Sequence, residues 1–255
     1  MIRKYLPYFV YKRLFGDRRK YHCKFDKNDQ DWLFWINTIT ATYEHRDKSL
    51  IDKLIKKNAY KIIQNPLINF HNKDIIEIGP GFLDHEQFWK NKSPKSFDLI
   101  DSNFDFLKIS KEKLSNRNIK SKRFLINESD DMAQIPSVSY DYVLSFFSLE
   151  HIMNLEEFTV HINRILKKDG YLIFVIPNEG HLAWGLGRYF FTRSYVYNKL
   201  GLDYDKIICW EHPNFSDKIL KCLDNNLENI KVYKVPNLLF LDFSISVKGI
   251  YRKKI

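Results

Sequence analysis

The chain has 255 residues, of which 44% are hydrophobic. This length fits one large α/β domain, or a domain with an appendage, and the composition allows a sizeable core. No run of 18 apolar residues occurs, so no transmembrane helix is predicted. The basic start "MIRKYLPYFVYKRLFG" is interrupted by Lys12 and Arg13 and lacks a small-residue cleavage site, so a signal peptide is not predicted either.

Charge and cysteine content narrow the range of candidate partners and cellular locations. The formal charge of +10 makes a nucleic acid or an anionic surface a candidate partner. The same excess also arises without function where Lys, Asn and Ile abound, as in proteins of AT-rich genomes. Cys23, Cys209 and Cys222 are odd in number and lack metal-ligand spacing, so we predict reduced thiols and a cytoplasmic location.

Helical and strand patterns follow one another along the chain. Residues 1–27 are basic and aromatic, and residues 28–65 are predicted to be helical up to the loop at Pro66. From Lys73 onward, short apolar runs alternate with helical segments, as expected for parallel strands covered on both faces. The predicted strands are "DIIEIG" (74–79), "SFDLID" (96–101), "RFLIN" (123–127), "YDYVLSFF" (140–147) and "GYLIFVIP" (170–177).

A crossover helix is predicted between the fourth and fifth strands. Asn154 can cap its start, and apolar residues between Leu155 and Ile165 form one stripe. Gly170 is predicted to end the helix as a left-handed C-cap. Such alternation of strands and helices is typical of an α/β fold.

The end of the chain adds two predicted strands, "NIKVYKV" (229–235) and "LDFSISVKGIYRKK" (241–254). Polar and apolar residues alternate in the last one, as expected for an antiparallel strand near a sheet edge. Before them, an aromatic, His-containing segment interrupts the alternation. We therefore predict an N-terminal helical cap (1–70) and an α/β domain (71–255) with a lid or substrate insertion at about 178–228.

The first predicted strand ends in a glycine turn. Gly79 and Gly81 would let the backbone approach a ligand closely, and a helix after them would offer free N–H groups. Asp101 follows at the end of the second strand, where an acidic residue takes ribose hydroxyls in nucleoside-binding folds. Asp84 stands where a dinucleotide fingerprint needs Gly, whereas Glu77 suits a ligand with an ammonium group and no pyrophosphate.

Four segments resemble, in order, the motifs of class I S-adenosylmethionine-dependent methyltransferases: "DIIEIGPG", "FDLID", "SYDYVLSFFSLEHI" and "ILKKDGYLIFVIPNEG". The resemblance covers about Lys73 to Gly180. It implies S-adenosyl-L-methionine as the cofactor. It also implies an α/β, Rossmann-like fold, with a seven-stranded, mostly parallel sheet, an antiparallel last strand and helices on both faces.

By position in these motifs, the implied cofactor-binding residues are Glu77, Gly79, Pro80, Gly81, Asp101, Ser102, Asp130, Asp131, Met132, Ser145 and Phe146. The resemblance implies that the glycine loop holds the methionine part, Asp101 the ribose, and Asp130 to Met132 the adenine. Ser145 and Phe146 would lie near the donor methyl group. The family often has a third Gly where this chain has Leu83, so the loop is expected to have a different shape there.

Methyl transfer to oxygen or nitrogen needs a group that accepts the proton of the acceptor. The candidate catalytic residues are His151 in "SLEHI", which resembles the LEH signature of small-molecule methyltransferases, and His212 with Glu211. We expect His212 to be the more exposed of the two histidines. A structural His151 beside the cofactor is an equally good interpretation. Metal-binding relatives carry Glu where Phe147 stands, so no metal is predicted.

The segment after the fifth strand carries the candidate substrate-binding residues His181, Arg188 and Arg193. A guanidinium group matches the geometry of phosphate or carboxylate. The alternative is a solvated lid helix. "EGHLAWGLGR" resembles uncharacterised methyltransferases of bacterial surface-polysaccharide loci.

We therefore predict transfer of a methyl group to O or N of a small molecule, a glycan or a lipid-linked precursor. A nucleic-acid (RNA) methyltransferase is the second hypothesis. Enzymes that methylate base amines usually carry Asn/Asp-Pro-Pro-aromatic after the fourth strand, and "SFFSLEH" has no proline, which argues against a nucleic-acid partner. A catalytically silent cofactor-binding module is the third hypothesis.

The first 20 residues contain seven Lys or Arg and five Tyr or Phe. Leu6, Phe9, Val10 and Leu14 could share a helix face after Pro7. The segment is either a structural cap or a weak peripheral anchor on anionic lipid. The sequence leaves both interpretations open.

Overall fold

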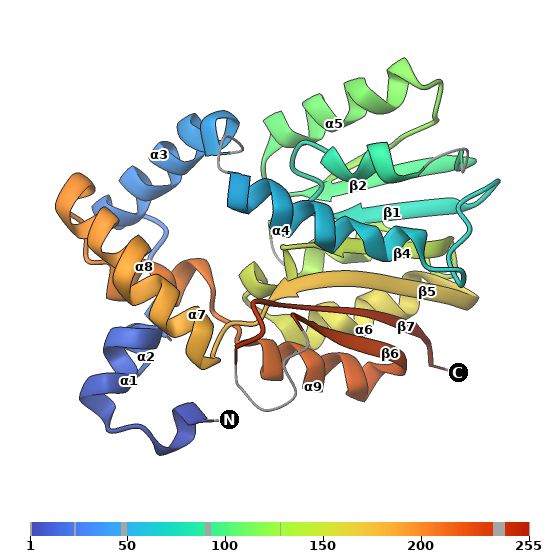
Figure 1. Ribbon diagram of the computed structural model, residues 1–255. Helices are drawn as coiled ribbons and strands as arrows, with labels where there is room; N and C mark the ends of the chain where they lie inside the picture. The colour runs from blue at the N-terminus through green and yellow to red at the C-terminus, as the bar shows by residue number, and fades with distance from the viewer. Residues whose placement is uncertain are drawn as a thin grey trace.

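The computed structural model describes residues 2–22, 24–46, 50–89, 93–127, 129–236 and 243–254, and it centres on a seven-stranded sheet (Figure 1). The strand order is β3-β2-β1-β4-β5-β7-β6. Neighbouring strands are parallel except at β7, which runs antiparallel to β5 and β6, so the predicted sheet is confirmed. The strands are β1 (Asp74–Ile78), β2 (Ser96–Asp101), β3 (Arg123–Leu125), β4 (Tyr140–Phe146), β5 (Leu166–Pro177), β6 (Leu227–Val235) and β7 (Ser246–Lys253).

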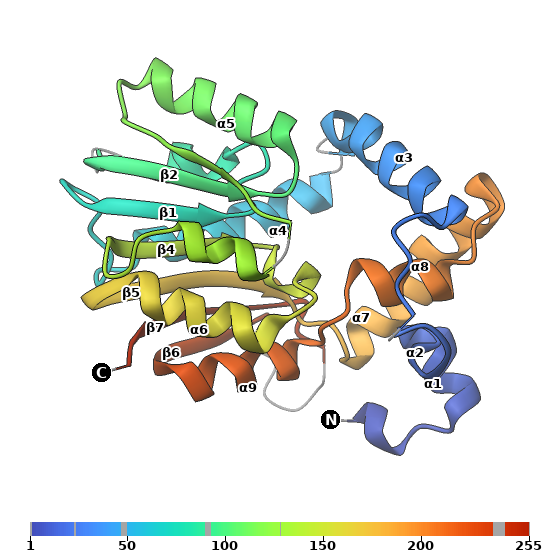
Figure 2. The same ribbon diagram turned by 180° about the vertical axis from the view of Figure 1, so that it is seen from behind.

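Helices cover both faces of the sheet, which explains the near-continuous apolar strands (Figures 1 and 2). Within β1, Ile75 packs into one core cluster, while Ile76 and Ile78 pack into the other. The first cluster is closed by α4 (Leu50–Tyr60) and α5 (Phe104–Asn116), and the second by α6 (Leu155–Ile165) and α9 (Ser216–Asn226). Both faces of the sheet are therefore covered by apolar packing, which leaves the ends of the strands for polar functional groups.

The predicted C-cap of the crossover helix is wrong. Helix α6 ends at Ile165, β5 begins at Leu166, and Gly170 lies inside that strand. The pairing of β4 with β5 shifts register here, so the residues after Leu166 leave the ladder before it resumes at Tyr171. A Cβ on Gly170 would lie 3.0 Å from the carbonyl oxygen of Tyr140. The glycine thus permits close packing of two strands and does not terminate a helix.

A helical lobe lies beyond the carboxyl ends of the strands (Figure 1). Its core joins Trp35 near the N-terminus to residues between Val196 and Trp210. The helices of the predicted cap and insertion are each divided between this lobe and the sheet, since α4 and α9 pack on the sheet. The lobe contains α1 (Tyr8–Phe15), α2 (Arg18–Tyr21), α3 (Gln30–Arg46), α7 (Leu182–Gly187), the π-helical turns η6 (Arg188–Arg193) and η7 (Val196–Leu200), and α8 (Tyr204–Glu211).

The remaining helices are short 3₁₀ turns that connect the main elements. They are η1 (Ile2–Tyr5), η2 (Lys61–Gln64), η3 (Asp84–Phe88), η4 (Ser129–Gln134) and η5 (Leu149–His151).

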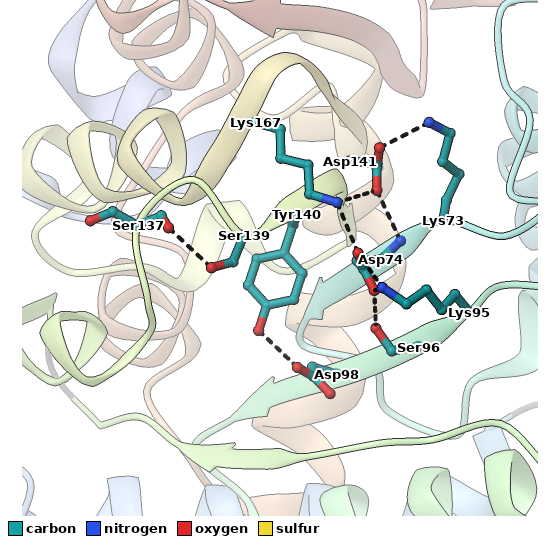
Figure 3. Close-up of polar contacts among 10 residues, drawn as sticks. All are labelled: Lys73, Asp74, Lys95, Ser96, Asp98, Ser137, Ser139, Tyr140, Asp141 and Lys167. Atoms are coloured by element: carbon teal, nitrogen blue, oxygen red, sulfur yellow. Dashed lines mark hydrogen bonds and ion pairs between the residues drawn. The ribbon is translucent and has the colours of Figure 1, made fainter.

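Charged side chains tie the amino ends of the strands together, at the edge opposite the glycine turn (Figure 3). The Lys167 ammonium group donates to Asp74 at 2.8 Å and to Asp141 at 2.7 Å. Lys73 also donates to Asp141, at 2.9 Å. Burial opposes the charge on both carboxylates, but the hydrogen bond from Lys167, its positive charge and hydrogen bonds from neighbouring groups together outweigh it and lower the pKa of Asp74 and of Asp141.

Replacing Lys167 with Met should lower the free energy of unfolding by about 1 kcal/mol at pH 7, since the group is partly solvated. Both aspartates have depressed pKa values in the fold, so their stabilising effect is present above the ordinary value of 3.8 and is lost as pH falls. The difference from wild type should therefore shrink below pH 4. Urea unfolding at pH 7 and pH 3 measures it. Lys168→Met, at an exposed neighbour, is the control, and an equal loss in both variants would contradict the assignment.

Candidate functional site

The glycine turn is held against the tip of β4. Gly79 and Gly81 have positive φ angles of 65° and 53°, a region that favours glycine. A Cβ on Gly79 would lie 2.5 Å from the Cβ of Ser148. The Ser148 hydroxyl donates to the Ile78 carbonyl at 2.7 Å and leaves its oxygen to accept from Ser145 at 2.7 Å. The loop therefore needs glycine at position 79 for both backbone angle and space.

The turn continues differently from the sequence expectation. Leu83 is fully buried and has a left-handed φ of 54°. A short 3₁₀ helix, η3 (Asp84–Phe88), follows it, in place of the helix that we expected to offer free N–H groups. The loop thus turns at Leu83 into η3, which places the His85 side chain in the core.

Glu77 begins a chain of buried hydrogen bonds beneath the loop. The Nε2 atom of His85 lies 2.9 and 2.8 Å from the two carboxylate oxygens of Glu77. Trp89 donates its indole N–H to Nδ1 of His85 at 3.0 Å. Because Nδ1 accepts, the His85 proton is on Nε2 and is donated to Glu77. Sequence reasoning named Glu77 and missed His85 and Trp89, whose spacing of eight and twelve residues from Glu77 fits no standard motif.

Asp101 lies beside the glycine turn, at the end of the neighbouring strand. The Gly79 amide donates to the Ile100 carbonyl at 2.8 Å, so the two strand ends are in contact. Asp101 accepts from the amide of Asn103 at 2.8 Å. Burial raises the pKa of Asp101 to about 6, although several backbone N–H groups oppose the shift. Ser102 is exposed next to it. The adjacent strand ends form the edge where this class of fold binds ligands.

The other predicted cofactor residues surround this edge. Met132 is fully buried, while Asp130 is exposed and Asp131 accepts from the Asn127 amide at 2.8 Å. These three residues lie in η4, after β3. Phe146, at the tip of β4, packs in the core against Tyr60 and His85 at centroid distances of 5.4 and 4.9 Å. Its ring therefore packs on the core side of the loop.

A second group of polar residues lies beyond the ends of β4 and β5, which we call the junction cluster. It consists of Arg18, Glu150, His151, Glu179, Arg188 and His212. Glu179 is at its centre and only 1% exposed. Its carboxylate lies 2.7 Å from Nδ1 of His212, 3.0 Å from Nη1 of Arg188 and 3.8 Å from Nη2 of Arg18. Side chains of the helical lobe thus meet one buried carboxylate that follows the end of a sheet strand.

Protonation within the junction cluster follows from these contacts. Burial opposes the charge on Glu179, but His212 and Arg188 outweigh it and lower its pKa to about 2. Burial likewise opposes the charge on His212, and the Glu179 carboxylate outweighs it, raising the His212 pKa to about 9. Burial raises the pKa of Glu150 to about 8. At neutral pH His212 is therefore a cation, and Glu150 is mostly a neutral acid.

The two candidate bases differ in the opposite sense to the expectation from sequence. The His151 side chain is 42% exposed, whereas that of His212 is 14% exposed. His151 donates from Nδ1 to the Glu211 carbonyl at 2.7 Å, which leaves Nε2 as its basic nitrogen. The two rings are in edge contact at 4.6 Å. His212 already holds its proton at neutral pH, whereas the hydrogen bond to the Glu211 carbonyl fixes the tautomer of His151.

The predicted substrate residues are not gathered in one place. Arg188 is buried in the junction cluster, so it is not on a solvated lid. Arg193 instead pairs with Asp205 through two contacts of 3.1 Å and lines a pocket of about 410 Å³ with Asp31. His181 is buried at the start of α7. Sequence reasoning missed Arg18 and Glu179, since only the folded chain brings an N-terminal arginine to the end of β5.

Comparison with known proteins agrees with the fold. Residues 76–174 match a protein family described as a methyltransferase domain. The matched segment, which runs from within β1 to within β5, resembles a methyltransferase domain. An uncharacterized protein from Methanocaldococcus jannaschii is 25% identical over 156 residues, which is 56% of this chain and 57% of the relative. The aligned stretch therefore spans little more than half of the relative's own length.

Solved structures of class I methyltransferases share the fold of this chain. A Listeria monocytogenes protein assigned as an S-adenosylmethionine-dependent methyltransferase aligns with a TM-score of 0.56 and 17% identity, covering 78% of this chain and all of that one. An S-adenosylmethionine-dependent methyltransferase from Mesorhizobium loti aligns with a TM-score of 0.55 and 12% identity, covering 76% and 97%. At these identities the likeness concerns the fold.

The residues at this edge of the sheet fit the cofactor that the fold implies. Gly79 and Gly81 add no side chains at two positions of the loop, and Asp101 is a partly buried acceptor one strand away. Within the described ranges, no group of three or more His, Cys, Asp or Glu side chains is arranged to hold a metal ion. Cys209 and Cys222 are buried free thiols, and Cys23 lies outside the described residues.

Proposed function

We propose that the protein transfers a methyl group from S-adenosyl-L-methionine to an oxygen or nitrogen of a small molecule, a glycan or a lipid-linked precursor. The observation that carries the proposal is the hydrogen bond from Gly79, in the turn after β1, to Ile100, which directly precedes Asp101 at the end of β2. His151 follows the tip of the adjacent strand β4. A nucleoside site and a proton acceptor thus lie on one edge of the sheet.

The chain's own residues would position the reactants and remove one proton. When bound, the cofactor supplies a methyl group on a sulfonium, which is already activated, so positioning provides much of the rate. Nε2 of His151 takes the proton of the acceptor. The donation from Nδ1 to the Glu211 carbonyl keeps this tautomer. Nε2 lies 4.0 Å from Glu150, whose carboxyl group is buried beside it.

The other hypotheses have weaker support. An RNA methyltransferase would suit the positive charge, but "SFFSLEH" follows β4 without the proline-containing motif of base-amine enzymes. A catalytically silent module would need the cofactor site without a proton acceptor, whereas His151 is exposed near that site. Turnover distinguishes the silent module from the enzyme.

One experiment tests the proposal and identifies the acceptor class. The protein is incubated with methyl-labelled S-adenosylmethionine and cell extract that has been separated into nucleic acid, lipid, glycan and small-molecule fractions. We expect label in the glycan, lipid or small-molecule fraction. Label confined to RNA would favour the second hypothesis, and no label in any fraction would favour the silent module.

We also propose a weak contact of the N-terminus with anionic lipid. Tyr5 and Phe9 are 87% and 66% exposed, and Arg13 is exposed one helical turn after Phe9. Arg3 and Arg18, in contrast, turn inward to Asp217 and Glu179. The segment is therefore partly structural and only its outer face is available. None of the helices in the described part of the chain is both long and apolar enough to cross a bilayer.

Liposome flotation tests this contact. Binding should require anionic lipid and weaken with salt, because each exposed cation contributes about 1 kcal/mol at such a surface. The variant Phe9→Ser/Arg13→Gln should lose it without disturbing the inward-facing arginines. Lys108→Gln/Lys120→Gln removes charge from the opposite end of the molecule as a control. Equal flotation with neutral and anionic vesicles, or none, would leave the segment as a structural cap.

A further inference from the structure

The charges in the junction cluster are not balanced by their direct contacts. Three groups that are cationic at neutral pH, Arg18, Arg188 and His212, share the two oxygens of one carboxylate, Glu179. Arg188 and Arg18 both face its Oε1 atom, and His212 faces Oε2. Glu150 and Glu211 are nearby, yet neither forms an ion pair with either arginine among the described residues. Buried charges are usually paired, so a further anion would balance the excess positive charge of this cluster.

Unsatisfied donors occur in the same cluster. Arg188 is 2% exposed, and its Nε has no hydrogen-bond partner among the described residues. The same holds for Nη2 of Arg18, whose side chain is 9% exposed. The indole N–H of Trp184 is also unpaired and lies four residues before Arg188, on the same side of the helix. Buried donors without partners point to a missing acceptor atom.

In this part of the described structure, fewer buried acceptor atoms than donor atoms lack a hydrogen-bond partner. Oε2 of Glu150 and Oδ1 of Asn214 lack hydrogen-bond partners in the described structure. Burial raises the Glu150 pKa to about 8, so its carboxyl group carries a proton at neutral pH and can itself donate. The unpaired groups of the cluster are therefore mainly donors.

We infer that the acceptor substrate carries an anionic group, a carboxylate or a phosphate, and that Arg18 and Arg188 bind it at the junction cluster. This inference rests on the proposed function and narrows its substrate class. The guanidinium groups come from α2 and from the start of η6, so the N-terminal helices contribute directly to the substrate site. His151 is the exposed member of the cluster and places the acceptor's reacting atom near the cofactor edge.

Arg193 provides a contrast within the same lobe. Two contacts of 3.1 Å to Asp205 satisfy its guanidinium group, and it lines the pocket that also includes Asp31 of α3. Its charge is matched by one carboxylate. Arg193 therefore has no need of a further anion, and Arg193→Gln is a matched control for the two arginines that do.

The test measures binding of inorganic phosphate and of acetate by calorimetry, at constant ionic strength set with NaCl. Wild type should bind at least one of the two anions. Arg18→Gln and Arg188→Gln should each weaken that binding by about 10- to 100-fold, the loss expected when a hydrogen bond to a charged group is removed. Arg193→Gln should bind like wild type. Preference for phosphate over acetate, or the reverse, identifies the anionic group.

Affinity for S-adenosylhomocysteine is measured on the same preparations, so the two proposals fail separately. Cofactor binding without any anion binding, or anion binding unchanged in Arg18→Gln, would overturn this inference alone. Anion binding that depends on Arg18, without cofactor binding, would overturn the proposed function and leave this site standing. If Arg188→Gln fails to fold by circular dichroism, Arg18→Gln decides, because Arg188 and His212 still neutralise Glu179 in that variant.

Discussion

Replacing His151 with Ala should lower turnover by about 10²- to 10⁴-fold and leave the affinity for S-adenosylhomocysteine unchanged. The reason is the tautomer fixed by the Glu211 carbonyl, which accepts from Nδ1 at 2.7 Å and keeps Nε2 basic. His212 cannot substitute for it, because its pKa is raised to about 9 and it is already protonated. Single-turnover kinetics with labelled cofactor, on the acceptor identified above, measures the effect.

His71→Ala is the control for this prediction, since His71 is an exposed histidine near the start of β1, away from the carboxyl edge. A His151→Asn variant keeps a polar side chain of similar size and should be as slow as His151→Ala. Full turnover in both His151 variants would mean that catalysis depends on positioning alone and that His151 is structural, the alternative that the sequence left open.

The largest effect on stability is expected for Glu179→Gln, which should lower the free energy of unfolding by about 3–5 kcal/mol. The substitution keeps the shape and removes the carboxylate that, among the described residues, pairs with Arg188, which is 2% exposed. An uncompensated buried guanidinium group is the physical reason. Glu228→Gln breaks a solvent-exposed pair with Arg252 and should lower stability by no more than about 1 kcal/mol. Chemical unfolding of both variants measures these losses of stability. Equal losses in the two variants would contradict the assignment.

The pairing of Glu179 with His212 predicts how the stability of the fold depends on pH. The pKa of Glu179 is depressed from 4.5 to about 2, so its stabilising effect is present above pH 4.5 and is lost as pH falls toward 2. The pKa of His212 is raised from 6.5 to about 9, so its contribution is complete below pH 6.5 and is lost as pH rises through 9. The difference in stability between wild type and His212→Gln should therefore shrink as pH rises from 6.5 to 9. A difference that grows with pH would contradict the pairing.

The sheet and the cofactor edge could be predicted because their signals are local in sequence. Apolar runs that end at Gly79 and Asp101 mark strand ends directly, and parallel strands bring those ends together. The prediction at Gly170 failed because a glycine that permits close packing of strands looks the same in sequence as a glycine that ends a helix. His85 was missed because its role depends on the left-handed turn at Leu83.

The junction cluster could not be predicted for a different reason. Arg18 and His212 are 194 residues apart, yet the guanidinium group donates to the His212 carbonyl at 2.6 Å. No short motif contains such a pair. The basic N-terminus was interpreted only as a cap or an anchor, while the packing of α1 and α2 on the lobe directs two of its arginines inward.

The cofactor site is the centre of this account, and calorimetry with S-adenosylhomocysteine tests it most directly. Wild type should bind with one site per chain. At pH 8 the Asp101 carboxylate, whose pKa is about 6, is ionised. Asp101→Ala should then weaken binding by about 1.5–3 kcal/mol, through the loss of charge-assisted hydrogen bonds. Asp105→Ala, at an exposed carboxylate in α5, should not. Undiminished affinity in Asp101→Ala, or no binding by wild type, would contradict the assignment.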